Sequence, residues 1–163
     1  MKPILTTMVY CLKANKVLLM LRKKEPNLGL WVGPGGKIEF NESPYECARR
    51  ELREETGLRA NNLHFRGFVT EVSPRPDWQW MLFMYVVTEI SGDLIGDERE
   101  GHLRWWSLSE AHQLPIPQGD KIFFPQVIDL SSPFYQAKYV YDADLKLIKV
   151  IDESGHDADD RVC

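Results

Sequence analysis

Hydrophobic and polar residues alternate in short blocks along the 163-residue chain, and the apolar blocks predict strands. The first two blocks are separated by the polar residues 13–15 and the last two by residues 142–144, which predicts a β-hairpin at each end of the chain. The predicted strands cover residues 5–12, 16–21, 63–72, 79–90, 103–108, 134–141 and 145–151.

A helix is predicted over residues 44–56, because both of its ends carry recognisable signals. Ser43 is a favourable N-cap residue, Pro44 suits the first helical position, and Glu46 completes a capping box with Ser43. Gly57 supplies the stop. Later in the chain, residues 109–113 predict one helical turn.

A second full helix is predicted over residues 120–130, with Pro125 as an awkward internal residue. Strands first, then a helix, more strands and a late helix indicate an α+β fold in which a sheet is sandwiched between helices. The length favours one domain, residues 1–152. Residues 153–163 are acidic and poor in apolar side chains, which predicts a flexible tail.

The charge balance limits the classes of partner. The net charge of −4 argues against avid binding to DNA or to a membrane surface. Three cysteines at irregular spacing predict neither a disulfide framework nor a zinc site, which fits the cytoplasm. We also expect no secretory signal and no membrane span. The oligomeric state is left open between monomer and homodimer.

Three glutamates stand at helical spacing: Glu51, Glu54 and Glu55 fall within one arc of the predicted helix. Like charges at this spacing repel each other, and the arc has no cation set aside for it, so we expect a divalent metal ion to bridge the carboxylates. Arg50 is placed to hydrogen-bond one of them and fix its direction. The alternative is an ordinary solvated helix face, which three glutamates alone would favour.

Other residues near this helix are candidates for substrate contacts. Glycines 33, 35 and 36 require a sharp turn or a close backbone approach before the helix. Arg22 and Lys37 are candidate phosphate-binding cations. The candidates for stacking on a base are Trp31 and a residue near Trp105. Asp120 is expected at the start of a helix, where it serves either as an N-cap or as an acceptor for purine N–H groups.

The ordered context of the glutamates resembles the signature of the Nudix hydrolase family, the Nudix box. The family pattern is a glycine, five residues, a glutamate, seven residues, and then R-E-U-x-E-E-x-G-U, where U is aliphatic. Every specified position is met here, within residues 36–58. The matching residues are Gly36, Glu42, Arg50, Glu51, Leu52, Glu54, Glu55, Gly57 and Leu58.

This resemblance implies a Nudix fold, with a mixed sheet between helices, and Mg²⁺-dependent hydrolysis of a nucleoside diphosphate-X compound, with Mn²⁺ as a possible substitute. The ligands implied by it are the three glutamates of the arc and the Gly35 carbonyl. Glu42 would hold or orient water, and Arg50 would brace a glutamate. Glu100 would supply an extra ligand or base, so that the general base stays open between Glu51 and Glu100.

Beyond the box, the chain resembles the MutT branch, especially bacterial 8-oxo-dGTP diphosphatases of the MutX type. This implies a small nucleotide substrate, most simply a triphosphate such as 8-oxo-dGTP that yields a monophosphate and pyrophosphate. The chain departs from the human relative that reads oxidised purines at two places, since Val32 replaces an asparagine and Gly119-Asp120 replaces two aspartates. The alternatives are ADP-ribose, a dinucleoside polyphosphate, an RNA 5′-triphosphate, or a non-catalytic nucleotide-binding regulator.

Overall fold

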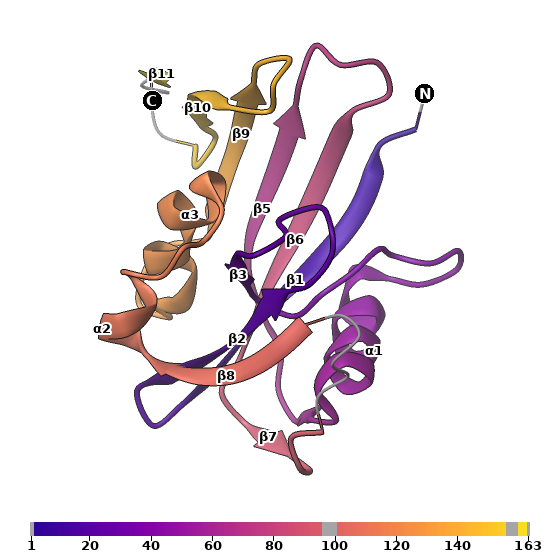
Figure 1. The fold of residues 1–163 in the computed structure, drawn as a ribbon, viewed down its shortest axis with the longest axis vertical. Coiled ribbons are helices and arrows are strands. Elements are labelled where there is room, and N and C mark those ends of the chain that lie inside the picture. The colour runs from indigo at the N-terminus through magenta and orange to yellow at the C-terminus, as the bar shows by residue number, and fades with distance from the viewer. Residues whose placement is uncertain (1, 96–100, 156–159, 163) are drawn as a thin grey trace.

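The computed structural model describes residues 2–95, 101–155 and 160–162, which form one mixed sheet with helices on both faces (Figure 1). The strands are β1 (Ile4–Lys13), β2 (Lys16–Arg22), β3 (Trp31–Val32), β4 (Arg59–Ala60), β5 (His64–Val72), β6 (Gln79–Val87), β7 (Ile90–Ser91), β8 (Gly101–Ser107), β9 (Tyr135–Tyr141), β10 (Leu147–Asp152) and β11 (Asp160–Val162). The helices are α1 (Pro44–Thr56), α2 (Leu108–Ala111) and α3 (Gln118–Ile128).

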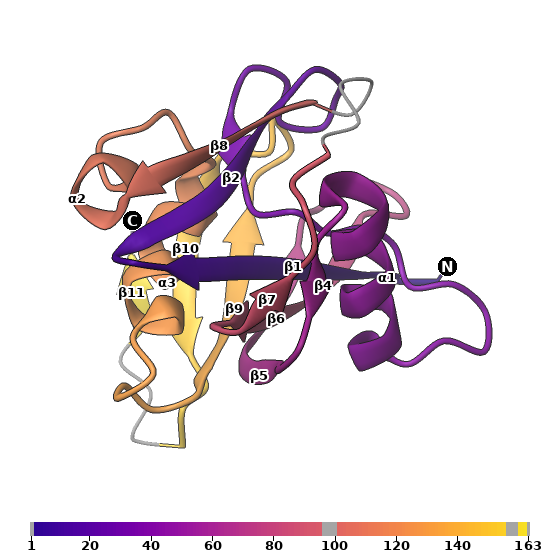
Figure 2. The same ribbon diagram turned by 90° about the horizontal axis from the view of Figure 1, so that it is seen from below.

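The large sheet runs in the order β11-β10-β9-β5-β6-β1-β2-β3, with β8 also paired to β2. β1 lies parallel to β6, and β5 lies parallel to β9, while the other pairs are antiparallel. β4 and β7 form a separate small ladder. In the described residues, α1 covers one face of the sheet and α3 the other (Figure 2). The α+β sandwich predicted from the sequence is therefore confirmed.

Two apolar cores occupy the two faces of the sheet. Under α1, the fully buried Ala48 and Leu52 pack in a cluster with Val9 and Val87. Under α3, the fully buried Phe123 packs in a larger cluster with residues of β5, β6 and β9. Each buried valine, leucine or phenylalanine side chain contributes roughly 1.5–3 kcal/mol by leaving water. The two cores hold α1 and α3 at fixed positions against the sheet.

Helix α1 begins and ends where the sequence predicts. The Ser43 side chain accepts a hydrogen bond from the Glu46 amide, and the Glu46 carboxylate accepts one from the Ser43 amide. At the other end, Gly57 has a φ of 77° and donates its N–H to the Arg53 carbonyl. A left-handed backbone of this kind favours glycine, because it has no Cβ.

Helix α3 begins at Gln118, two residues earlier than predicted, with Pro117 in the N-cap position. Pro125 lies inside it. The end of the helix is held by Arg66 of β5, whose guanidinium donates to the carbonyl oxygens of five residues in 126–133 at 2.7–3.4 Å. These contacts satisfy carbonyl groups that a helix end leaves without partners, and they fix α3 to the sheet.

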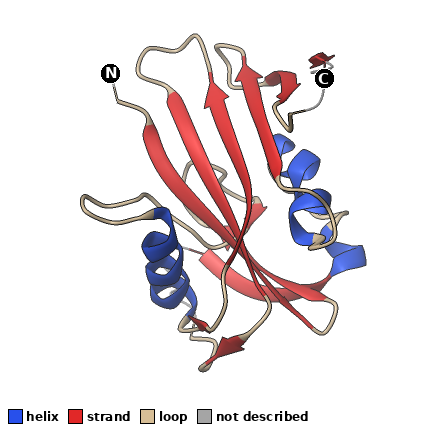
Figure 3. Ribbon diagram, turned by 180° about the vertical axis from the view of Figure 1, so that it is seen from behind, coloured by secondary structure: helices blue, strands red, loops and turns tan. Residues whose placement is uncertain are grey.

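Two further differences from the predicted elements have local causes. The strand predicted over 79–90 divides into β6 and β7, because Asn62 accepts hydrogen bonds from the amides of Thr88 and Glu89 at 3.0 and 3.1 Å. Part of the predicted flexible tail is a strand, since β11 pairs with β10 (Figure 3). The open edge of β10 offers backbone partners to any nearby segment. No helix in the described part of the chain is long and apolar enough to cross a membrane.

Candidate active site

A cleft of about 760 Å³ lies between the glycine-rich segment 33–37, helix α1, the start of α3 and the sheet. It brings together residues from most parts of the chain. The predicted site residues that line it are Arg22, Gly35, Lys37, Glu51, Glu54, Glu55 and Asp120. The cleft therefore joins the acidic arc of α1 to two cationic side chains and to the beginning of α3.

The glycine-rich segment runs against β1 at close range. The Thr7 amide donates to the Gly36 carbonyl at 2.9 Å. A Cβ atom on Gly35 would overlap the Thr7 carbonyl. The glycines of this segment do not adopt a positive φ, so they are needed for close backbone approach and not for an unusual turn. This packing holds the Gly35 backbone beside the carboxylates of α1.

The three glutamates of the arc lie in different surroundings. Glu55 is buried, at 8% exposure, and its carboxylate accepts a hydrogen bond from the Gly35 amide at 3.0 Å. The Glu51 carboxylate packs directly against Gly36, where a Cβ atom would overlap it. Glu54 is the most accessible, with 60% of its side chain exposed. All three nonetheless face the same cleft.

Arg50 donates hydrogen bonds to the carboxylates of Glu42, Glu51 and Glu54. Its Nε and Nη2 donate to the two oxygens of Glu42 at 2.7 and 2.9 Å, a bidentate pair. Its Nη1 donates to Glu51 at 2.8 Å and to Glu54 at 3.1 Å. The prediction that the arc lacks a cation of its own is therefore wrong. Arg50 supplies this cation, because its hydrogen bonds to Glu42, on the loop before the helix, hold the guanidinium beside the arc.

These contacts separate the acidities of the carboxyl groups. The hydrogen bonds from Arg50 lower the pKa of Glu42 to about 2, so Glu42 is ionised throughout the neutral range. Burial raises the pKa of Glu51, and the hydrogen bond and charge of Arg50 oppose that rise only in part. A carboxylate with a raised pKa accepts a proton more readily, which is the property that a general base requires.

The donor set fits a hard divalent cation in its chemistry, because carboxylates and a backbone carbonyl are the ligands that Mg²⁺ prefers. In the described residues, no three acidic, histidine or cysteine side chains are gathered closely enough to enclose a metal ion. The reason is visible in the contacts, since Arg50 holds Glu51 and Glu54 while the Gly35 amide holds Glu55. Side-chain rotation, most easily that of the exposed Glu54, would be needed to bring them together.

The two predicted phosphate-binding cations line the same cleft. The Arg22 Nε donates to the carbonyls of Lys24 and Pro26 at 3.3 and 2.7 Å, so this side chain also shapes its own loop. The Lys37 ammonium lies 5.9 Å from the ring centroid of Trp80, within the range of a cation–π contact. Glu100 lies outside the described residues, and its role stays a prediction.

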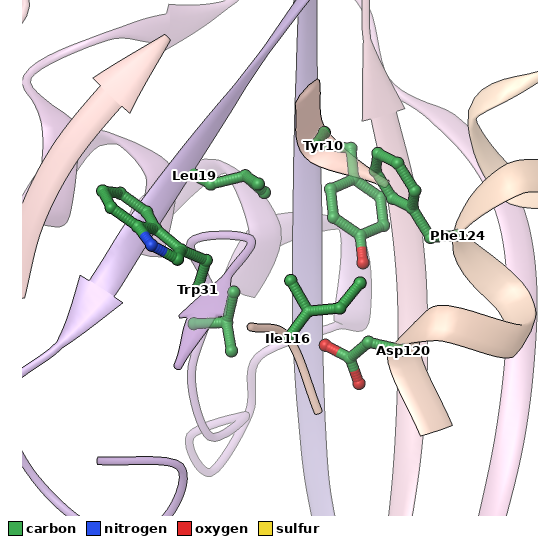
Figure 4. Close-up of a pocket in the computed structure, with 8 residues that line it drawn as sticks. Tyr10, Leu19, Trp31, Ile116, Asp120 and Phe124 are labelled. Carbon is green, nitrogen blue, oxygen red and sulfur yellow. The ribbon is translucent and has the colours of Figure 1, made fainter. Parts of the chain in front are cut away.

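The structure places Trp31 away from the cleft. It is only 9% exposed, packs edge-to-face on Trp106 with ring centroids 5.1 Å apart, and lines a narrow inner cavity (Figure 4). Stacking on a base from this position would require Trp31 to leave the core. The expected stacking residue is therefore replaced as a candidate by Trp78 and Trp80, which line the cleft itself.

Asp120 is not the N-cap of α3, since Pro117 holds that position and makes no side-chain cap. Its carboxyl group lies in the first turn, between the inner cavity and the cleft, and points towards Ile116 and Tyr10 (Figure 4). Asp120 is 8% exposed, and its Oδ2 has no hydrogen-bond partner in the part of the chain that the structure describes. Burial raises the pKa of Asp120, and the charge of Glu71 raises it further.

Glu71 on β5 and Tyr141 on β9 line the cleft and were missed by the sequence analysis. The Tyr141 hydroxyl donates to Glu71 at 3.1 Å. One signal for Glu71 was present, because it shares a strand face with the buried Gly67 and Val69. A carboxyl group on an otherwise core-facing stripe is rare unless it has a partner or a function.

Comparison with known proteins agrees with this arrangement. Residues 2–127 match the family model described as the NUDIX domain. The protein named "Uncharacterized Nudix hydrolase YvcI" of Bacillus subtilis is 36% identical over 109 residues, which are 65% of this chain and 67% of that protein. The oxidized purine nucleoside triphosphate hydrolase of Mus musculus is 39% identical over 125 residues, 76% of this chain and 79% of that protein.

A solved structure shares the whole fold. The crystal structure of a MutT protein from Bacillus halodurans superposes with a TM-score of 0.81 at 32% identity, covering 90% of this chain and 95% of the other. The family match spans most of the chain, and it includes the glutamates, the glycine-rich segment and Arg50. The chain therefore belongs to the Nudix family and is a MutT-like Nudix hydrolase.

Proposed function

We propose that this Nudix pyrophosphohydrolase converts a nucleoside triphosphate to a monophosphate and pyrophosphate, with an oxidised purine such as 8-oxo-dGTP as the preferred base. The observation that carries the proposal is the shared cleft. It joins the acidic groups of α1 to the cations Arg22 and Lys37 and, at the start of α3, to a buried carboxyl whose Oδ2 has no hydrogen-bond partner in the described residues. The name of the mouse relative, an oxidized purine nucleoside triphosphate hydrolase, points to the same substrate class.

The family typically uses a divalent metal, and Mg²⁺ is the ion we propose, with Mn²⁺ as a substitute. Glu51, Glu54 and Glu55 would hold it together with the Gly35 carbonyl. When bound, such an ion neutralises phosphate charge and lowers the pKa of water. Arg50 keeps the glutamates oriented through its hydrogen bonds to Glu51 and Glu54.

The rest of the reaction is assigned to this chain's own groups. Arg22 and Lys37, which line the same cleft, neutralise the outer phosphates. Glu42, held ionised by Arg50, orients water beside the arc. Glu51 and Glu100 are the two candidates for accepting the proton from the attacking water.

A substrate panel tests the proposal. Purine and pyrimidine triphosphates, 8-oxo-dGTP, ADP-ribose, a dinucleoside polyphosphate and an RNA 5′-triphosphate are incubated with Mg²⁺, and the products are identified. We expect a monophosphate and pyrophosphate from a purine triphosphate, and no product after exhaustive chelation. If ADP-ribose or the RNA 5′-triphosphate is preferred, that compound replaces the nucleoside triphosphate as the proposed substrate, and the hydrolysis of a diphosphate linkage still stands. Binding without turnover of any of them would indicate a regulator.

The role of the arc is tested by Glu54→Gln. Because this change removes an anionic ligand of the activating metal, we expect kcat to fall by two or more orders of magnitude, roughly 3 kcal/mol or more, with an unchanged folded structure. Glu46→Gln is the matched control on the same helix, since Glu46 is exposed and glutamine also completes a capping box. Near-normal turnover of Glu54→Gln would show that Glu54 is only surface charge.

The role of Asp120 is tested by Asp120→Asn. If its carboxylate accepts hydrogen bonds from purine N–H groups, the change should raise KM for a purine triphosphate and leave a pyrimidine triphosphate much less affected. Equal effects on both classes, or none, would remove Asp120 from base recognition.

A further inference from the structure

Glu71 lines the cleft near Asp120 at the start of α3. In the strand register it stands directly opposite Trp80 of β6, so the two side chains project from the same face with their Cβ atoms about 5 Å apart. From the other side, the Tyr141 hydroxyl of β9 donates to the Glu71 carboxyl at 3.1 Å. All three residues line the cleft, as does Asp120.

This group has more hydrogen-bonding capacity than the described residues use. The Asp120 Oδ2 and the Trp80 indole nitrogen are both buried without a hydrogen-bond partner in the part of the chain that is described. Leaving a buried donor or acceptor unpaired costs about 1–3 kcal/mol. An unpaired acceptor and an unpaired donor on the walls of one cleft therefore indicate a ligand that supplies the missing partners.

The ionised forms of the Glu71 and Asp120 carboxyl groups are unfavourable in this region. Burial raises the pKa of Glu71 to about 7, and the hydrogen bond from Tyr141 only partly opposes the rise. The charge of Glu71 in turn raises the pKa of Asp120, so the two carboxyl groups are electrostatically coupled. A ligand with N–H donors would relieve this, because hydrogen bonds to the ionised form stabilise it.

We propose that Glu71 is a specificity-determining residue which, with Asp120 and the Trp80 indole N–H, selects a base carrying two neighbouring N–H donors beside a carbonyl acceptor. That pattern is the edge of a 6-oxo-2-aminopurine, shared by guanine and 8-oxoguanine, with N1–H and the 2-amino group as donors and O6 as acceptor. The inference rests on the proposed function, because it places a nucleotide base at this end of the cleft.

Other bases present a poorer match to these groups. Adenine offers a 6-amino donor beside an N1 acceptor, and cytosine offers a 4-amino donor beside an N3 acceptor. Hydrogen bonds from N–H donors of a ligand favour the ionised form of Glu71 and Asp120. Against the ionised carboxylates, each of these bases would set a ring nitrogen lone pair opposite an oxygen that only accepts. Discrimination by a site built to hydrogen-bond a substrate group is strong, because the mismatched ligand leaves buried groups unpaired.

The competing explanation is that Glu71 is structural and serves only to anchor Tyr141. Glu71→Gln separates the two roles, since the glutamine carbonyl still accepts from the Tyr141 hydroxyl while one carboxylate oxygen becomes a donor. Tyr141→Phe is the matched control, because it removes the anchor and retains the carboxyl group. Trp80→Phe tests the indole N–H with a ring kept in place.

The experiment is calorimetric titration of the metal-free protein with dGMP, dAMP and dCMP, alongside the kinetics of the corresponding triphosphates with Mg²⁺. We expect wild type to bind dGMP most tightly. In Glu71→Gln, dGMP affinity should fall at least tenfold, about 1.4 kcal/mol, while dCMP affinity stays within twofold. Tyr141→Phe should retain the preference for dGMP, and Trp80→Phe should weaken it.

An unchanged ratio of dGMP to dCMP affinity in Glu71→Gln overturns the proposal, as does a wild-type protein without preference for dGMP. If Glu71→Gln does not fold, the ratio measured for Trp80→Phe decides, and an unchanged ratio there also overturns the proposal. Failure of the proposed function looks different, because wild type would then hydrolyse none of the triphosphates. Wild-type turnover combined with an unaltered base preference in the variants leaves the proposed function standing and removes Glu71 from it.

Discussion

Glu71→Gln should also change how the stability of the fold depends on pH. A glutamate with a folded pKa of about 7 and an ordinary value of 4.5 binds its proton more tightly in the folded state. Its contribution to stability is therefore fully present below pH 4.5 and is lost as the pH rises through 7. The difference between these two pKa values corresponds to about 3 kcal/mol, an upper figure because Asp120 titrates together with Glu71.

The assay is urea unfolding of the metal-free protein at pH 4.5 and pH 8, followed by circular dichroism. We expect the unfolding free energy of wild type to fall between these pH values by up to about 3 kcal/mol more than that of Glu71→Gln. Glu89→Gln, at an exposed site after β6, is the control and should behave as wild type. Parallel pH dependence of wild type and Glu71→Gln would refute the reasoning, since it would mean that Glu71 is effectively hydrated in the fold.

Two further predictions concern the acidic arc. Gly36→Ala should lower kcat at least tenfold with a stability loss near 1 kcal/mol, because the atoms nearest to the new Cβ all belong to the Glu51 carboxylate. Gly35→Ala should destabilise the whole fold, because its new Cβ meets the backbone of Thr7 and Met8. Thermal melts and kinetics compare the two variants, and equal melting temperatures would contradict the packing argument. Arg50→Lys should raise the pKa of Glu42 from about 2 towards its ordinary value and lower kcat, because a lysine cannot make the bidentate pair. NMR titration of the carboxyl group measures this pKa. An unaltered pKa would show that Arg50 does not control it.

Local signals in the sequence were enough for helix α1 and for the order of its acidic residues. The cap residues Ser43, Glu46 and Gly57 act within one or two turns of the backbone, so their effect does not depend on the rest of the fold. The spacing of Glu51, Glu54 and Glu55 likewise places them on one arc of any helix. The α+β order of elements followed from the apolar pattern in the same way.

Contacts between distant segments were decided only by the tertiary structure. Arg50 serves the arc as its cation because the loop carrying Glu42 folds back beside α1. Trp31 does not line the cleft, because it packs on Trp106 of β8, and β8 pairs with β2. Neither outcome follows from a periodicity, since each depends on which strands become neighbours.

The end of the cleft near Asp120 shows the same division most clearly. Glu71, Trp80 and Tyr141 stand on three different strands, and they meet because β5 pairs with β6 on one side and with β9 on the other. Strand register is set by the burial of whole sheet faces, and a shift by one residue would turn each of these side chains to the opposite face. The sequence by itself thus determined helix α1 and the family, whereas strand pairing decided which groups line this end of the cleft.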